Sequence, residues 1–133
     1  MYDFQRIVDR SLARRITRDL LEYNKVSCRP RDIIRRPHYS IHQNGELLGW
    51  IGCSRFRSDV YEIRHMTVLP QFQRQGVGKA AAEYIIEELK NRGIRLAYCY
   101  IRRENRASRK LYESLGFEVR RYGKMMTYAR GLF

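Results

Sequence analysis

Two glycines separated by one residue stand in a short segment that could bind phosphate. The segment, 73–79, lies between a run with strand character and a stretch with helical periodicity. At the start of a helix several backbone N–H groups lack partners and lie at the positive end of the helix dipole. Gly76 and Gly78 would let the oxygens of a pyrophosphate approach the backbone. Arg74 and Lys79 would add positive charge. The segment is therefore predicted to bind an anion, and it consists of Gln73, Arg74, Gln75, Gly76, Val77, Gly78 and Lys79.

A G-x-G pair is weak evidence when it stands alone. Glycine at the junction of a strand and a helix more often only makes the turn, and the full dinucleotide-binding pattern G-x-G-x-x-G is absent. The phosphate-binding interpretation therefore depends on other residues at the right spacing along the chain.

An acidic residue interrupts the β-branched and aromatic run at 60–69. Side chains alternate between the two faces of a strand, so Glu62 is predicted to share a face with Arg64, Met66 and Val68. A carboxylate near the start of such a strand could accept a proton from a bound substrate. Glu62 is therefore the first candidate for a general base. The structural alternative is an ion pair across the sheet with Arg64 or Arg55.

Tyr112 is the candidate for the acid that protonates a leaving group. It directly follows Leu111 in a stretch with helical periodicity, so its hydroxyl is expected at the edge of the buried face, within reach of a cleft. A tyrosine that only packs against the core is the structural alternative. If Glu62 has only a structural role, His65 and Glu104 are the substitute bases.

The elements that must position these residues follow from periodicity and turn residues. Helical spacing of apolar residues predicts amphipathic helices at 11–23, 77–91 and 105–115. Runs rich in β-branched and aromatic residues predict strands at 39–43, 46–56, 60–69, 96–101, 117–122 and 125–129. Asn44-Gly45 is expected to join the first two strands in a tight hairpin. Two prolines predict an irregular connection over 29–38.

The order of these elements predicts the fold class. A strand–helix–strand unit requires a right-handed crossover and parallel pairing, so the strand at 96–101 is expected to pair with the strand that ends at Val68. The prediction is an α/β fold with a central mixed sheet, an antiparallel N-terminal meander, one parallel strand pair and flanking helices. A length of 133 residues is typical of one domain, and a single domain over 1–133 is expected.

Two motifs in the right order resemble those of the GNAT superfamily of N-acetyltransferases. The pattern at 73–78 resembles the family's Q/R-x-x-G-x-G/A signature, and the segment 105–117 is similar to its N-x-x-[AS]-x-x-[LF]-Y-x-x-x-G-F block. The resemblance extends from about Tyr39 to the C-terminus, whereas a first strand is not evident and the N-terminal helical region looks abbreviated. It implies the GNAT acyl-CoA N-acyltransferase fold.

The resemblance also implies a cosubstrate, which is acetyl-CoA. In members of this family the segment matching 73–79 holds the pyrophosphate of CoA. Asn105 would orient the cofactor or else only cap the helix that it begins. The backbone N–H of Met66 would polarise the thioester carbonyl. Met66 and Val68 would form hydrogen bonds with the pantetheine amides, as an added strand does.

The same resemblance implies transfer of an acetyl group to a primary amine of a protein, peptide or small molecule. The amine would attack directly in a ternary complex. Glu62 would deprotonate the acceptor through water, and Tyr112 would protonate the departing thiolate. Such an enzyme is an acyltransferase that needs no metal.

The charge of the chain suggests an anionic partner. The net charge is +13, and 22 of the 27 basic residues are arginine. The alternative function is therefore a basic nucleic-acid-associated module, including one that acetylates an RNA-bound amine, although no nucleic-acid motif supports it. Solvated arginines that reflect genome composition are the simpler explanation. The candidate phosphate contacts are Arg29, Arg31, Arg35, Arg36, Arg102, Arg103, Arg106, Arg109 and Lys110. Trp50, Tyr98 and Tyr100 are interpreted as core or cleft-wall residues rather than a base-stacking platform.

The remaining features predict an ordinary intracellular protein. The three cysteines are widely separated and lack zinc-ligand spacing, so they are expected to be reduced and structural: Cys28, Cys53 and Cys99. The first residues do not resemble a secretory signal, and no apolar run is long enough to cross a bilayer. The expected location is the cytoplasm, without membrane contact, as a monomer or a homodimer.

Overall fold

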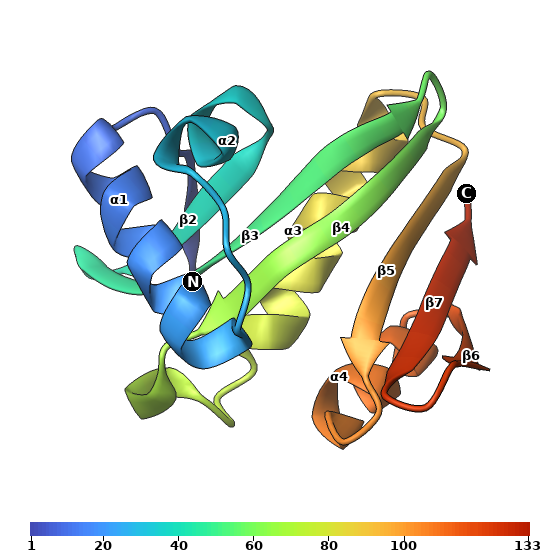
Figure 1. Ribbon diagram of the computed structural model, residues 1–133. Coiled ribbons are helices and arrows are strands. Elements are labelled where there is room, and N and C mark those ends of the chain that lie inside the picture. The colour runs from blue at the N-terminus through green and yellow to red at the C-terminus, as the bar shows by residue number, and fades with distance from the viewer.

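Seven strands form one sheet in the order β1-β2-β3-β4-β5-β7-β6 in the computed structural model, which describes residues 1–133 (Figure 1). The strands are β1 (Asp3–Arg6), β2 (His38–Gln43), β3 (Glu46–Arg57), β4 (Val60–Val68), β5 (Leu96–Arg102), β6 (Glu118–Tyr122) and β7 (Met126–Leu132). The helices are α1 (Arg10–Asp19), α2 (Pro30–Arg35), α3 (Val77–Asn91) and α4 (Arg106–Ser114). A π-helical turn, η1 (Leu20–Asn24), continues α1, and a 3₁₀ turn, η2 (Pro70–Phe72), follows β4.

The predicted fold class is confirmed by this sheet. All strand pairs are antiparallel except β4 and β5, which are parallel and are connected through α3. The hairpin turn between β2 and β3 has positive φ angles at Asn44 (53°) and Gly45 (78°), as an Asn-Gly turn requires. The final hairpin also forms, but its second strand, β7, lies between β5 and β6.

Two N-terminal elements differ from the sequence-based expectation. The segment 29–38, expected to be irregular, contains the helix α2, because Pro30 occupies its first turn, where a missing N–H costs nothing. Asp32 accepts a hydrogen bond from the backbone N–H of Arg29 and so caps this helix. The first strand, which was not evident in the sequence, is β1, and it pairs with β2 at the sheet edge.

Helices cover the two faces of the sheet unequally. The larger core lies between the sheet and α3 and includes Ile85, Leu89 and, from α4, Tyr112. A smaller core lies under α1 and α2 on the opposite face and includes Ile16, Ile33 and Trp50. Figure 1 shows α1 and α2 in front of the β2–β4 half, while no helix lies in front of β5 and β7.

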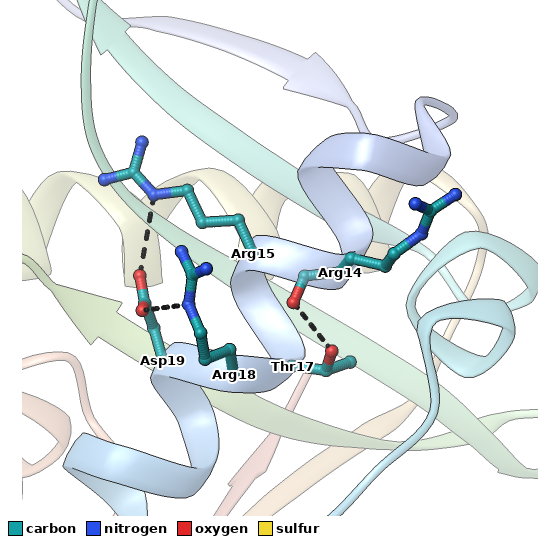
Figure 2. A network of polar contacts seen from close by, with 5 residues as sticks. All are labelled: Arg14, Arg15, Thr17, Arg18 and Asp19. Atoms are coloured by element: carbon teal, nitrogen blue, oxygen red, sulfur yellow. Dashed lines mark hydrogen bonds and ion pairs between the residues drawn. The ribbon is translucent and has the colours of Figure 1, made fainter.

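The helix α1 ends beside a buried carboxylate. Asp19 is 7% exposed, and its oxygens lie 3.6 Å from Arg15 Nε and 3.8 Å from Arg18 Nε (Figure 2). Arg14 extends to the other side of the helix, and the hydroxyl of Thr17 donates to its backbone carbonyl. The two arginines compensate the charge that burial of Asp19 would leave unpaired. No helix of the protein is both long and apolar enough to cross a membrane.

Candidate functional site

A cleft opens where β4 and β5 separate. The parallel ladder contains three pairs, and its last pair is Glu62 with Tyr98. Beyond this point the strands diverge, as Figure 1 shows, and a cavity of about 380 Å³ lies between them. Its lining includes the only carboxylate of the cleft, Glu62, together with Tyr112 and Asn105. The substitute base Glu104 does not line the cavity.

A second cavity continues the cleft to the start of α3. It measures about 630 Å³ and shares part of its lining with the first cavity: Tyr23, Asn24, Met66, Asn105 and Ser108. Most of the residues predicted to bind the cofactor line it, namely Met66, Val68, Gln73, Arg74, Gly76, Val77, Gly78 and Asn105. Gln75 and Lys79 belong to the same loop but do not line the cavity. The backbone carbonyl of Gln75 accepts a hydrogen bond from Tyr2.

The loop before α3 presents free backbone donors. Gly76 caps the helix with φ at +86°, a conformation that L side chains rarely adopt, and no side chain caps the first turn. Ala80 makes the first helical bond, to the carbonyl of Gly76. The N–H groups before it therefore remain available to an anion. A Cβ at Gly78 would make ordinary van der Waals contacts with the side chains of Val68 at 3.7 Å and Leu111 at 4.0 Å, so it would fit without a clash.

A β-bulge changes which residues of β4 share a face. Arg64 pairs with Gly52, but Thr67 pairs with Trp50, so one extra residue is inserted between them. The bulge leaves His65 with a φ of +62°, a strained backbone conformation for a residue other than glycine. The expectation that Glu62, Arg64, Met66 and Val68 share one face is therefore wrong. Glu62 and Arg64 lie on the α1–α2 side, whereas Met66 and Val68 pack against the core on the α3 side.

The cleft is therefore lined from both faces of the sheet. Glu62 reaches it from the α1–α2 side, since it pairs with Tyr98 on the face that α3 and α4 do not cover. Tyr112 reaches it from the α3–α4 side, where its ring packs 5.2 Å from that of Phe117. The cleft thus places a carboxylate on one side and a tyrosine hydroxyl on the other.

Tyr112 is 3% exposed. Burial first, and then the neighbouring Cys99, raise the pKa of its hydroxyl well above the ordinary value of 10.0. The hydroxyl therefore keeps its proton at any working pH. Burial likewise raises the pKa of the Cys99 thiol to about 12, which makes this cysteine unreactive.

A pair of histidines, the buried His38 and the half-buried His65, holds the bulge. His38 Nδ1 lies 3.0 Å from the carbonyl oxygen of Arg36, which can only accept, so this nitrogen carries the proton. His38 Nε2 then accepts from His65 Nδ1 at 2.9 Å. His65 Nε2 is left as a buried acceptor with no partner in the protein. Gly52 makes room for the pair, because a Cβ there would overlap the His38 ring.

The histidine pair should make stability depend on pH. An ordinary histidine has a pKa of 6.5. Burial lowers the pKa of His38 to about 4. The pKa of His65 is lowered to about 3, mainly by burial and secondly by the neighbouring His38. The unfolded chain therefore binds more protons below pH 6.5, and stability is full above that pH and is lost as the pH falls toward 4. We expect urea unfolding to show a loss of roughly 4 kcal/mol between pH 7 and pH 5.

The variant that tests this dependence is His38→Gln combined with His65→Gln. It should have a flatter stability profile between pH 7 and pH 5, where carboxylates contribute little. An unchanged slope in the variant would assign the dependence to other groups. The low pKa of His65 also makes it a weak base, which favours Glu62 over this substitute.

Asn24 is a cleft residue that the sequence did not reveal. Its side-chain nitrogen lies 3.5 Å from the Met66 carbonyl, and its side-chain oxygen accepts from Thr67 at 3.1 Å. The backbone carbonyl oxygen of Asn24 lies 3.5 Å from a guanidinium nitrogen of Arg102. The end of η1 therefore bridges the separated strands. Only the position of Asn24 after an amphipathic helix could have suggested a structural role.

Asn105 lies where it can both cap α4 and contact a molecule in the cleft. Its side-chain oxygen accepts from the backbone N–H of Ser108 at 3.2 Å and caps α4, and it lines both cavities. Gln73 is oriented by a bond of 3.0 Å from its side-chain nitrogen to the Val68 carbonyl. The Gln73 contact connects the loop before α3 to the diverging end of β4.

A family profile and a curated relative both match this chain, and both are N-acetyltransferases. The profile described as "Acetyltransferase (GNAT) family" matches residues 10–117. A curated relative, the [ribosomal protein bS18]-alanine N-acetyltransferase of Escherichia coli K12, is 35% identical over 80 residues, which cover 60% of this chain. The match spans 53% of that relative, about half of its length.

Solved structures share the fold at lower identity. The ribosomal-protein-S18-alanine N-acetyltransferase of Escherichia coli superposes with a TM-score of 0.77 and 22% identity, covering 98% of this chain and 91% of that one. A putative acetyltransferase of Salmonella typhimurium, solved with acetyl-CoA, gives a TM-score of 0.79 at 19% identity, covering 98% and 93%. The arrangement of strands and helices is common to all three.

Proposed function

The chain belongs to the GNAT acetyltransferase family, and on that basis we propose that it transfers an acetyl group from acetyl-CoA to the α-amino group of a protein. The observation that supports this proposal best is the cleft between β4 and β5. It runs from the free N–H groups before α3 to a carboxylate on one side and a protonated tyrosine on the other. This order matches the phosphate end, the thioester and the attacking amine of a single reaction.

Acetyl-CoA would lie along the cleft as a substitute strand. Its pyrophosphate would bind the backbone donors before α3, close to the charge of Arg74. The β5-facing edge of β4 beyond Glu62 has no strand partner, so the pantetheine amides can use it as an added strand does. Met66, at the bulge, would present its N–H to the thioester oxygen. Asn105 would orient the chain between the two cavities.

The amine would approach from the face that carries Glu62. There the carboxylate would take a proton from the amine, directly or through water, as the nitrogen attacks the carbonyl carbon. Tyr112, on the other face, would give its proton to the sulfur as the C–S bond breaks. Both substrates are bound at once, so the acetyl group passes directly between them.

An α-amino group suits this site better than a lysine side chain. An ordinary α-amino group has a pKa near 8, against 10.4 for lysine, so a far larger fraction is neutral at pH 7.5. Arg64 and Arg102 line the cleft and would disfavour cationic acceptors. The curated relative is named for acetylating an alanine of a ribosomal protein. We therefore choose an N-terminal alanine as the first acceptor to test.

The test compares two peptides of the same sequence, each with one internal lysine. The first begins with a free alanine, and the second carries a formyl group on that alanine. We expect acetyl-CoA-dependent release of free thiol, and a mass increase of one acetyl group, only with the first peptide. Equal acetylation of both peptides would assign the reaction to lysine. No transfer to either peptide, with acetyl-CoA binding intact, would exclude this α-amino acceptor.

A further inference from the structure

The sheet face opposite α4 carries an aromatic surface that no element covers. β5, β7 and β6 point alternate side chains toward this face, and Phe56, near the end of β3, contacts Tyr98 there. In Figure 1 it is the side of β5 and β7 that faces the viewer. Five aromatic residues form this surface, here called the aromatic platform: Phe56, Tyr98, Tyr100, Tyr122 and Tyr128.

The rings of the aromatic platform are in continuous contact. The ring centroid of Tyr100 lies 5.9 Å from that of Tyr98, 5.5 Å from that of Tyr128 and 5.4 Å from that of Tyr122. Phe56 extends the row at 6.1 Å from Tyr98. These distances are typical of aromatic pairs, so the rings support one another and stay ordered without a covering layer.

Three of the five residues of the aromatic platform are exposed to solvent, and Tyr98 and Tyr128 are half-buried. Tyr100 is 44% exposed, Tyr122 58% and Phe56 61%. Trp50, by contrast, is fully buried, as expected from the sequence. The interpretation of Tyr100 as a core or cleft-wall residue holds only in part. Tyr100 lines the cleft, but it is also open to solvent. A contiguous exposed aromatic surface usually marks a binding site.

Arginines surround the aromatic platform. The guanidinium of Arg57 lies 5.2 Å from the Phe56 ring centroid, and three more arginines share this face: Arg102, Arg120 and Arg130. Arg120 and Arg130 share a single carboxylate, Glu118, at 2.8 and 3.6 Å, so positive charge is left over. A second copy of a chain with net charge +13 would be repelled here. The surface therefore fits a polyanion.

We propose that the aromatic platform binds single-stranded nucleic acid, with bases stacked on its tyrosines and phosphates held by the surrounding arginines. An open sheet whose exposed rings stack unpaired bases is a known solution to this problem. An acidic protein would satisfy the arginines but would leave the row of rings without planar partners. A duplex would hide its bases inside the stack.

The aromatic platform is continuous with the cleft. Tyr98 pairs with Glu62 at the last rung between β4 and β5, and Tyr100 lines the cleft itself. A bound strand would thus lie beside the side from which we expect the amine to approach. This inference does not depend on the proposed acetyl transfer, since the aromatic platform and its arginines lie outside residues 73–79, which we propose to bind the pyrophosphate.

The experiment measures fluorescence anisotropy of a labelled 12-nucleotide single-stranded RNA with the full chain at several salt concentrations. We expect a Kd on the order of 1–10 μM at low salt that weakens as salt rises. The combined variant Tyr122→Ala and Tyr128→Ala should weaken binding about 100-fold, about tenfold per ring, at every salt concentration. Its salt slope should match that of the wild type, because stacking is lost and phosphate contacts remain.

The matched control is Tyr122→Phe with Tyr128→Phe, which keeps both rings and should keep wild-type affinity. Thermal unfolding verifies that both variants are folded. A single-stranded DNA of the same sequence distinguishes a ribose requirement from stacking alone, and either result supports the proposal. Three results would overturn it: no binding by the wild type, equal binding by the alanine variant, or tighter binding of a duplex or an acidic peptide.

Discussion

Replacing Tyr112 with phenylalanine is expected to lower kcat about a hundredfold while leaving the Kd for acetyl-CoA nearly unchanged. The hydroxyl is buried, keeps its proton, and lines the cleft opposite the carboxylate. Phenylalanine preserves the ring contact with Phe117, so the loss should be confined to the proton that the thiolate needs. The measurement is steady-state release of free thiol with the alanine peptide, combined with calorimetry of acetyl-CoA binding.

The matched control is Tyr39→Phe. Tyr39 is also buried, but its hydroxyl accepts a hydrogen bond from Arg92 at 3.0 Å and does not line the cleft. This variant should lose about 1 kcal/mol of stability and keep its kcat. If Tyr112→Phe turned over at the wild-type rate, another group or water would have to protonate the sulfur.

Replacing Gly76 with glutamate should weaken acetyl-CoA binding at least about a hundredfold. The glycine caps α3 in a left-handed conformation, and the new side chain would bring a negative charge to the N–H groups proposed to bind pyrophosphate. We expect a wild-type Kd of about 1–100 μM by calorimetry, and no measurable heat for the variant.

Gly93→Glu controls for backbone strain in this experiment. Gly93 also has a left-handed φ, +76°, and open space beside it, but it follows the opposite end of α3. Both variants should lose similar stability, and only Gly76→Glu should lose the cofactor. Loss of binding in both would attribute the effect to strain. A wild type that does not bind acetyl-CoA would contradict the proposed activity.

The central elements were predictable because local signals and the global fold agree. The helix α3 has apolar residues at helical spacing, Asn44-Gly45 supplies the hairpin angles, and Asn105 caps α4 as its position suggested. The parallel pairing of β4 and β5 follows from the length of the crossover. These features depend on residues close together in the sequence, which is why pattern alone identified them.

The features that failed depend on contacts distant in sequence. The strand β1 has four residues and no alternating pattern, and it exists because β2 offers an edge to pair with. Whether Pro30 begins a helix or interrupts one cannot be read from the proline itself. The bulge at His65 needs a hydrogen-bond partner in His38, 27 positions away. It also needs a glycine at position 52, because a Cβ there would overlap the His38 ring.

The candidate site was predictable as a set of residues but not as an arrangement. The sequence predicted residues 73–79, Glu62 and Tyr112 as site residues, and all of them except Gln75 and Lys79 line one continuous cleft. The period-two rule could not foresee that the bulge would move Met66 to the other face from Glu62. Asn24 carries no motif, since its bond to the Met66 carbonyl depends on where the π-helical turn ends.

The separation of β4 and β5 also affects how the protein holds together. The two parts of the sheet share a ladder of three residue pairs, and the edges beyond it have no strand to bind. A molecule that fills this space contributes cohesion to the folded state as well as chemistry, and its binding energy adds to the free energy of unfolding by mass action. The lifetime of the folded protein would then follow the supply of its cosubstrate. Scarcity of the cosubstrate would leave the sheet weakest along the line where we propose that the reaction takes place.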